Sequence, residues 1–351
     1  RSHSSTSFLL LGCWANGHTK AMQPKLWDFC LKLRKKDAVL AEAGLDKPRS
    51  AWKPFLHISG MYGPERGCIA LVSEVLPKER RGYGTAMVAY IAVLVESLRR
   101  AGVYDAYTRC PRFLRFGQAM LHFVQPWGEH LSNTGDHGDD FGVRQFILGR
   151  LSRRDPALLW LLRTLSYPTQ LPAKQHMWPE VPLAKGEQVP CSAFSLLILD
   201  ALNKKPALPK GTTQFVDRGR GIVSFRSGWD KDATFVVFDG AQRSASAQGH
   251  HHDSGGHFSL SALGEYFAID TGRYNIEQDQ HNVVLVDGKS GQSTDGNWRM
   301  SWYHGRLTSY QADDFCDTAM VDSSQMSNCY WAYRHLGLVK GAHPYVWTVE
   351  D

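Results

Sequence analysis

Residues 257–270 read His257-Phe-Ser-Leu-Ser-Ala-Leu-Gly-Glu-Tyr-Phe-Ala-Ile-Asp270, and this stretch predicts two short strands, 257–262 and 266–270. Similar short runs, rich in β-branched and aromatic residues and bounded by Gly or Asp, occur on both sides of it. They predict further strands at residues 221–226, 233–238, 282–286, 303–311, 330–339 and 345–351. Because these strands follow one another with no helices between them, we expect an antiparallel β domain.

The N-terminal part of the chain shows helical spacing instead. Predicted helices cover residues 86–100, 113–124, 141–151, 156–165 and 192–202. Asp155 directly before Pro156 is typical of a helix N-cap followed by the first helical position. Helices followed by strands, without alternation, exclude a doubly wound dinucleotide fold. They favour an α+β multidomain chain, with a helical domain at 1–209 and a β domain at 210–351 that we expect to be incomplete at its C-terminus, because the chain stops inside a predicted strand.

The composition is that of a folded protein with an uneven charge distribution. Of 351 residues, 43% are hydrophobic, and 11 Trp, 16 Phe and 13 Tyr exclude a disordered chain. No apolar run approaches the roughly 20 residues of a membrane span. Residues 216–351 carry 11 basic and 17 acidic side chains, so residues 1–215 carry 29 and 17. The basic part predicts an acidic partner, and no nucleic-acid recognition motif accompanies it.

The cysteines carry little information about function. There are seven of them, an odd number, and no Cys-x-x-Cys pair occurs. This pattern disfavours both a complete disulfide framework and a cysteine zinc site.

The densest group of chemically reactive side chains is Gly249-His250-His251-His252-Asp253, followed by Asp270 and His281. Neutral imidazoles together with a carboxylate are ligands that a divalent metal such as zinc takes from a protein. If the histidine run is a strand, His250 and His252 share one face and His251 takes the other. Asp270, at the end of a neighbouring strand, and His281 would then complete the site. Three adjacent histidines in a solvated turn are the alternative.

These motifs resemble the heparinase II/III family of polysaccharide lyases. The resemblance rests on Phe225-Arg-Ser-Gly-Trp229, the histidine run above, His257-Phe-Ser-Leu-Ser-Ala-Leu-Gly-Glu-Tyr-Phe-Ala-Ile-Asp270-Thr-Gly and His281-Asn-Val-Val-Leu-Val-Asp-Gly288. It implies an (α/α) toroid followed by an antiparallel β-sandwich. It also implies β-elimination on an anionic, uronate-containing polysaccharide (heparin or heparan sulfate, another glycosaminoglycan, or alginate) by a secreted or periplasmic enzyme.

The resemblance also implies roles for residues of the β domain. Counted back from Phe258 without gaps, the family pattern places one structural Zn²⁺ on His252, Asp270 and His281 and a catalytic role on His250. The sequence departs from the pattern at Ser254, where the family usually has Asp. A one-residue bulge that used Asp253 instead would shift the histidine assignment to His251.

The helical part matches the family less closely. The stretch Arg109-Cys-Pro-Arg-Phe-Leu-Arg-Phe116 looks like the segment that carries the catalytic Tyr in the family, but Phe116 stands where that Tyr belongs. Tyr107 or Tyr104 could substitute for it. His57 lies at the spacing of the family's carboxylate-binding His, with a hydrogen-bonded interior histidine as the alternative.

Two further features are candidates for substrate binding. Arg109, Arg112 and Arg115 recur every three residues, which places them on one face of a helix, where they could bind sulfate or carboxylate groups or simply face solvent. His137 lies in the Gly/Asp-rich stretch 135–140, which suits either sugar hydroxyls or an ordinary turn.

Two other functions compete with a lyase. Phe116 favours a non-catalytic carbohydrate-binding or structural relative. A zinc hydrolase is the weaker alternative, because the sequence has no His-Glu-x-x-His motif.

Overall fold

The computed structural model describes part of the chain. The described residues are 99, 105–109, 111–128, 131–132, 144–164, 180–182, 188–190, 204–242, 252–270, 277–289, 291 and 303–351. Those up to Phe116 belong to one compact unit and those from Gly117 onward to another. The predicted helix at 192–202 and nearly all of that at 86–100 lie outside the described residues, and the domain boundary between 209 and 210 stays a prediction.

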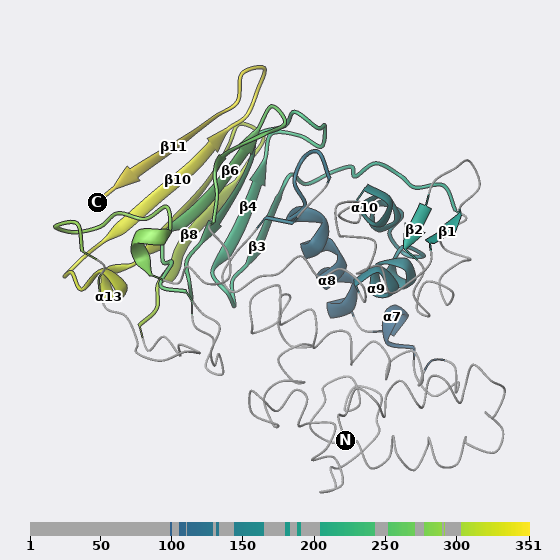
Figure 1. Ribbon diagram of the computed structural model, residues 1–351, viewed down its shortest axis with the longest axis horizontal. Coiled ribbons are helices and arrows are strands. Elements are labelled where there is room, and N and C mark those ends of the chain that lie inside the picture. The colour runs from purple at the N-terminus through teal and green to yellow at the C-terminus, as the bar shows by residue number, and fades with distance from the viewer. Residues whose placement is uncertain are drawn as a thin grey trace, which may run out of the picture. The chain divides into compact units, whose positions relative to one another are not determined.

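Two antiparallel sheets form the C-terminal part of the chain (Figure 1). The five-stranded sheet has the order β3-β4-β5-β6-β7, with β3 at Gln214–Asp217, β4 at Ile222–Arg226, β5 at Phe235–Asp239, β6 at His257–Ala262 and β7 at Glu265–Ala268. The four-stranded sheet has the order β11-β10-β9-β8, with β8 at Arg306–Ala312, β9 at Cys316–Asp322, β10 at Tyr333–Val339 and β11 at Tyr345–Glu350. The prediction of an antiparallel β architecture is confirmed.

The two sheets share one hydrophobic core. Because successive side chains of a strand point to opposite faces, every second residue of a strand reaches this core. The five-stranded sheet contributes Val223, Phe225, Val236 and Phe238, and the four-stranded sheet contributes Ala319, Val321, Leu336 and Leu338. The sheets therefore pack face to face as a sandwich.

The described helices are short. They are α7 at Ala106–Arg109, α8 at Pro111–His122, α9 at Arg144–Leu151, α10 at Ala157–Thr164 and α13 at Ser324–Ser327, and a small hairpin pairs β1 at Glu180–Pro182 with β2 at Gln188–Pro190. The carboxylate of Asp155 accepts a hydrogen bond of 3.0 Å from the backbone N–H of Ala157, which confirms the predicted cap of α10. None of the described helices is long and apolar enough to cross a membrane.

The sequence prediction fails in three places in the β part, at residues 282–286, at β3 and at β9. Residues 282–286 were expected to form a strand, but they form a loop after the 3-10 helix η4 (Gln278–Gln280). Val284 and Val286 are 50% and 48% exposed, so their β-branched side chains do not pack in the hydrophobic core. Strand β9 was not predicted, because its run has no aromatic residue and its apolar residues Ala319, Met320 and Val321 are consecutive, so they show no alternation with polar ones.

A buried arginine joins the end of α8 to the five-stranded sheet. Arg226 of β4 is 1% exposed, and its Nη2 donates a hydrogen bond to the carbonyl of Val124. Its guanidinium lies 4.6 Å from the centre of the Trp229 ring and 4.3 Å from that of Phe235. Burial lowers the pKa of Arg226 to about 9, opposed by Asp230, so the group is still a cation at neutral pH. Arg226 therefore links β4 to the segment that follows α8.

His122, the last residue of α8, packs beside this arginine. Its ring stacks on Phe215 at 5.4 Å between centroids and meets Trp229 edge-on at 5.2 Å. Burial and, second, the charge of Arg226 lower the pKa of His122 to about 3. The folded state thus holds His122 in its neutral form.

We expect His122→Phe to flatten the pH dependence of stability. The pKa of His122 is lower in the folded than in the unfolded state. Its contribution to the free energy of unfolding is therefore fully present above about pH 6.5 and is lost as the pH falls toward about 3. The slope reaches about 1.4 kcal/mol per pH unit for one proton. Urea unfolding of both proteins from about pH 7 to about pH 5 measures it, and parallel profiles would contradict the assignment.

Candidate metal centre

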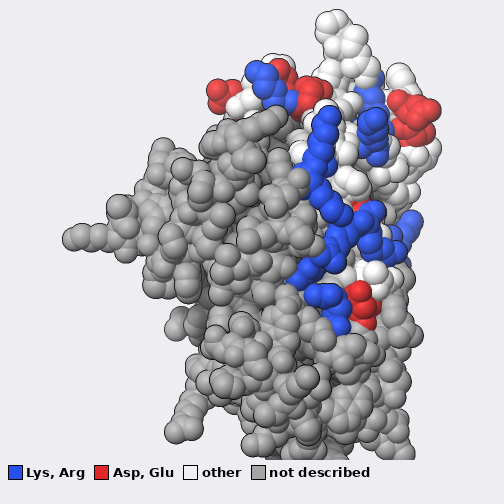
Figure 2. All heavy atoms as spheres, turned by 90° about the vertical axis from the view of Figure 1, so that its right-hand side faces the viewer, with Lys and Arg blue, Asp and Glu red and all other residues white. Residues whose placement is uncertain are grey.

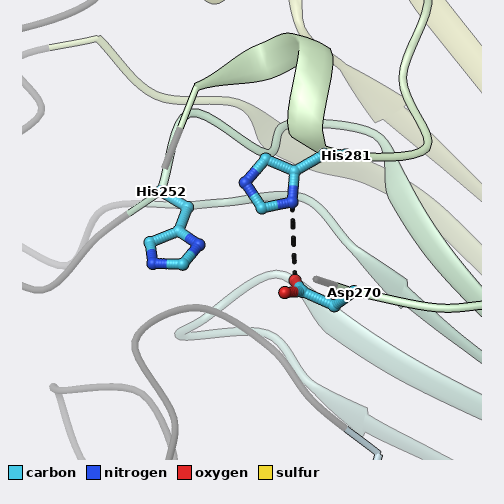
Figure 3. Close-up of side chains that lie close together, drawn as sticks. All are labelled: His252, Asp270 and His281. Carbon is cyan, nitrogen blue, oxygen red and sulfur yellow. Dashed lines mark ion pairs between the residues drawn. The ribbon is translucent and has the colours of Figure 1, made fainter. Parts of the chain in front are cut away.

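Three buried side chains far apart in the sequence meet at one end of the five-stranded sheet. His252 lies in the loop before β6, Asp270 follows the end of β7, and His281 follows η4. One ligand atom from each lies within 4.8 Å of the others. Figure 3 shows the three side chains, with the ring of His281 facing the carboxylate of Asp270. The structure thus brings together the three residues that the family resemblance implies as metal ligands.

A tight turn places His252 beside the sheet. The backbone N–H of His257 donates to the carbonyl of Ser254 at 2.9 Å, and that of Gly256 donates to the carbonyl of Asp239 at 2.9 Å. Gly256 has φ +84°, a conformation that favours glycine. His252 lies in this loop and not in a strand, so strand alternation does not set the direction of its side chain.

The separation of Asp270 and His281 fits two ligands of one tetrahedral metal ion. Asp270 Oδ2 lies 3.5 Å from His281 Nδ1. Two ligands about 2.0–2.1 Å from a tetrahedral ion lie about 3.4 Å apart. Neither ring nitrogen of His281 makes a hydrogen bond to another described residue, although the ring is buried. Both nitrogen atoms are therefore available, one of them to a metal.

The burial of this group also favours a cation. The side chain of Asp270 is fully buried, and a buried carboxylate is costly unless positive charge compensates it. Two imidazoles and one carboxylate form a donor set that zinc takes in proteins, with a fourth position left for water or another ligand. The residues present therefore fit the predicted zinc ion.

The other predicted site residues are only partly described. His57, His137 and His250, like the alternatives His251 and Tyr104, lie outside the described residues. Tyr107 lies in α7 and is 3% exposed, and Phe116 lies in α8 and is 5% exposed.

The three arginines fall on two helices. Arg109 ends α7, and Arg112 and Arg115 belong to α8. Arg115 is exposed, whereas the side chains of the other two lie outside the description. Their role in substrate binding stays a prediction.

Sequence reasoning missed two residues that surround the candidate ligands, His257 and Asn282. His257 Nε2 lies 3.6 Å from Asp270 Oδ2, and its Nδ1 accepts a hydrogen bond from the backbone N–H of Asn282. A signal was available in β6, where His257, Ser259 and Ser261 occupy alternate positions. A polar face on a strand of a two-layer fold indicates either solvent or a buried polar site, and here the face is buried.

We expect Asp270→Asn and His281→Gln to lose zinc. Each removes one ligand and leaves a polar, uncharged side chain in its place. The wild-type chain should bind about one zinc ion and gain about 2.7 kcal/mol of unfolding free energy at a zinc concentration 100 times Kd. Metal analysis and thermal melting with and without zinc measure both effects. His304→Ala, which alters an exposed histidine, is the control and should bind zinc normally. Zinc-dependent melting in the two ligand variants would contradict the site.

Comparison with known proteins finds similarity in structure. No protein-family model and no curated protein sequence matches the chain. Heparan sulfate lyase HepC from Pedobacter heparinus superposes with a TM-score of 0.51 at 14% identity, over 86% of this chain and 42% of that one. A structure of heparinase III gives 0.52 at 12% identity, over 82% and 41%. The chain spans about two fifths of the length of these structures. Over this part of their length the chain shares the fold of these heparinase structures.

Proposed function

We propose that this chain belongs to a secreted or periplasmic polysaccharide lyase of the heparinase II/III type. Its substrate would be heparin, heparan sulfate, another glycosaminoglycan or alginate. The observation that carries the proposal is the buried group of His252, Asp270 and His281 within a heparinase-like fold. In this proposal residues 1–209 form an (α/α) toroid, and Zn²⁺ is held by the three buried side chains.

The chemistry assigns a role to each proposed residue. In β-elimination a base removes the proton on the carbon next to the uronate carboxylate, the electron pair forms a C=C bond, and the C–O bond to the leaving sugar breaks. The departing oxygen then takes up a proton. His57 would hold the uronate carboxylate, and Tyr107 and His250 would transfer protons. Zinc, when bound, supplies a charge that holds the loops of its three ligands together.

Surface charge supports an anionic substrate. Lys and Arg side chains gather on the described part of one face (Figure 2). Segments 153–154 and 204–210 lie side by side, because the backbone N–H of Ala207 donates to the carbonyl of Pro156 at 3.4 Å. Five exposed basic side chains come from these segments: Arg153, Arg154, Lys204, Lys205 and Lys210. Such a surface attracts a polyanion at low ionic strength.

Cleavage is expected on at least one member of a panel of heparin, heparan sulfate, hyaluronan, chondroitin and alginate. The product of β-elimination is an unsaturated uronate, which absorbs in the ultraviolet. A folded, zinc-loaded protein that produces no absorbance on any member would contradict the lyase proposal.

His250→Ala is expected to abolish this activity while zinc stays near one ion per chain. The reason is that His250 would transfer a proton to or from the substrate, whereas His252 would bind the metal. His251→Ala is the matched control, and it should retain activity. If His250→Ala loses the metal instead, or His251→Ala is the inactive variant, the assignment is wrong by one residue.

A non-catalytic carbohydrate-binding relative is the second candidate. The observation that favours it is Phe116, which has no hydroxyl and is buried in α8. Retention of an oligosaccharide on a glycan array, with no release of unsaturated product, would identify this function.

A further inference from the structure

His257 is buried against the candidate ligands, but the compact group of ligand atoms does not include it. Its Nε2 lies 3.6 Å from Asp270 Oδ2, longer than a hydrogen bond, and its ring meets that of His281 at 5.3 Å between centroids. The group of described residues whose ligand atoms all lie within 4.8 Å of one another consists of His252, Asp270 and His281. His257 therefore lies next to Asp270 and His281 but is not one of the three candidate ligands.

A hydrogen bond fixes which ring nitrogen of His257 carries the hydrogen. The backbone N–H of Asn282 donates to His257 Nδ1 at 3.1 Å. A backbone amide can only donate, so Nδ1 presents a lone pair. The hydrogen of the neutral ring is then on Nε2, the atom that faces Asp270. A nitrogen that carries hydrogen cannot be a metal ligand, whereas it can attract and orient a carboxylate.

The side chain of Asn282 holds the segments that meet here. Its amide nitrogen donates to the carbonyl of Phe258 and to that of Ile269, each at 3.0 Å. Phe258 follows His257, Ile269 precedes Asp270, and Asn282 itself follows His281. Both amide hydrogens are thus used to set the spacing between His257 and two of the three candidate ligands.

The second sheet holds the same loops from the other side. Arg334 of β10 donates through Nη1 to the carbonyl of Gly256 at 2.7 Å and to that of Asn282 at 2.5 Å. Its Nε pairs with Glu350 at 2.5 Å. The backbone on either side of the His257–Asn282 hydrogen bond is therefore fixed, and the orientation of the His257 ring with it.

We propose that His257 is a positioning residue, held by Asn282, that orients the carboxylate of Asp270 for the metal and is not itself a ligand. The inference rests on the zinc centre of the proposed function. It distinguishes a centre with two imidazole ligands from one with three. It also explains why His257 is buried beside a metal centre that already has three protein ligands.

The test compares His257→Gln with His257→Leu in the full chain. Gln can present an N–H toward Asp270, whereas Leu has similar bulk and no donor. We expect His257→Leu to weaken zinc binding about 10- to 100-fold, and His257→Gln to recover most of the affinity. Competition with a chromophoric chelator measures zinc affinity. X-ray absorption of the zinc-loaded protein counts imidazole ligands, and two are expected in wild type and in both variants. His343→Ala, an exposed histidine, is the control.

Several results would overturn the proposal. If X-ray absorption counts three imidazole ligands on zinc in wild type and two in His257→Gln, His257 is itself a ligand. This comparison does not need the Leu variant to fold. Zinc affinity in a folded Leu variant within about twofold of wild type would remove the positioning role. A wild-type chain that binds no zinc would remove the centre altogether, and the separate absorbance assay would then show whether lyase activity exists without it.

Discussion

The hydrogen bonds of Asn282 are the constraint on which the candidate centre depends. The loops that carry His252, Asp270 and His281 are irregular, so no strand ladder fixes their spacing. The Asn282 amide provides that spacing, because it bonds the carbonyl of Phe258 in β6 and that of Ile269, which directly follows β7. Side chains at such a centre must be placed within a fraction of an ångström, and rigid supporting hydrogen bonds achieve this.

The sandwich supplies a second level of support. Its core brings the four-stranded sheet against the five-stranded one, and only then can Arg334 reach the loops beside β6. The guanidinium bonds two backbone carbonyls and one carboxylate, so its charge is well satisfied although it is largely buried. Packing of the two sheets and assembly of the centre are therefore linked through one side chain.

Much of this arrangement could be predicted from the sequence, and the reasons for the remainder are physical. Alternation and turn residues predicted β4, β5, β6 and β10, and the resemblance pointed to the three buried side chains. Residues 282–286 were mistaken for a strand, because β-branched residues look alike in a strand and in a loop fixed by hydrogen bonds. The contact between His257 and Asp270 depends on the register of β6 and β7, including a bulge near Leu260, which the sequence pattern does not specify.

The burial of Arg226 has a consequence for the order in which the molecule opens. If the segment after α8 separated from β4, the guanidinium would lose the Val124 carbonyl while still enclosed by Trp229 and Phe235. A partly opened state of that kind leaves an enclosed cation without its acceptor, and its population is correspondingly small. The segment and the strand therefore form one cooperative unit, in which local fluctuation of either requires the opening of both.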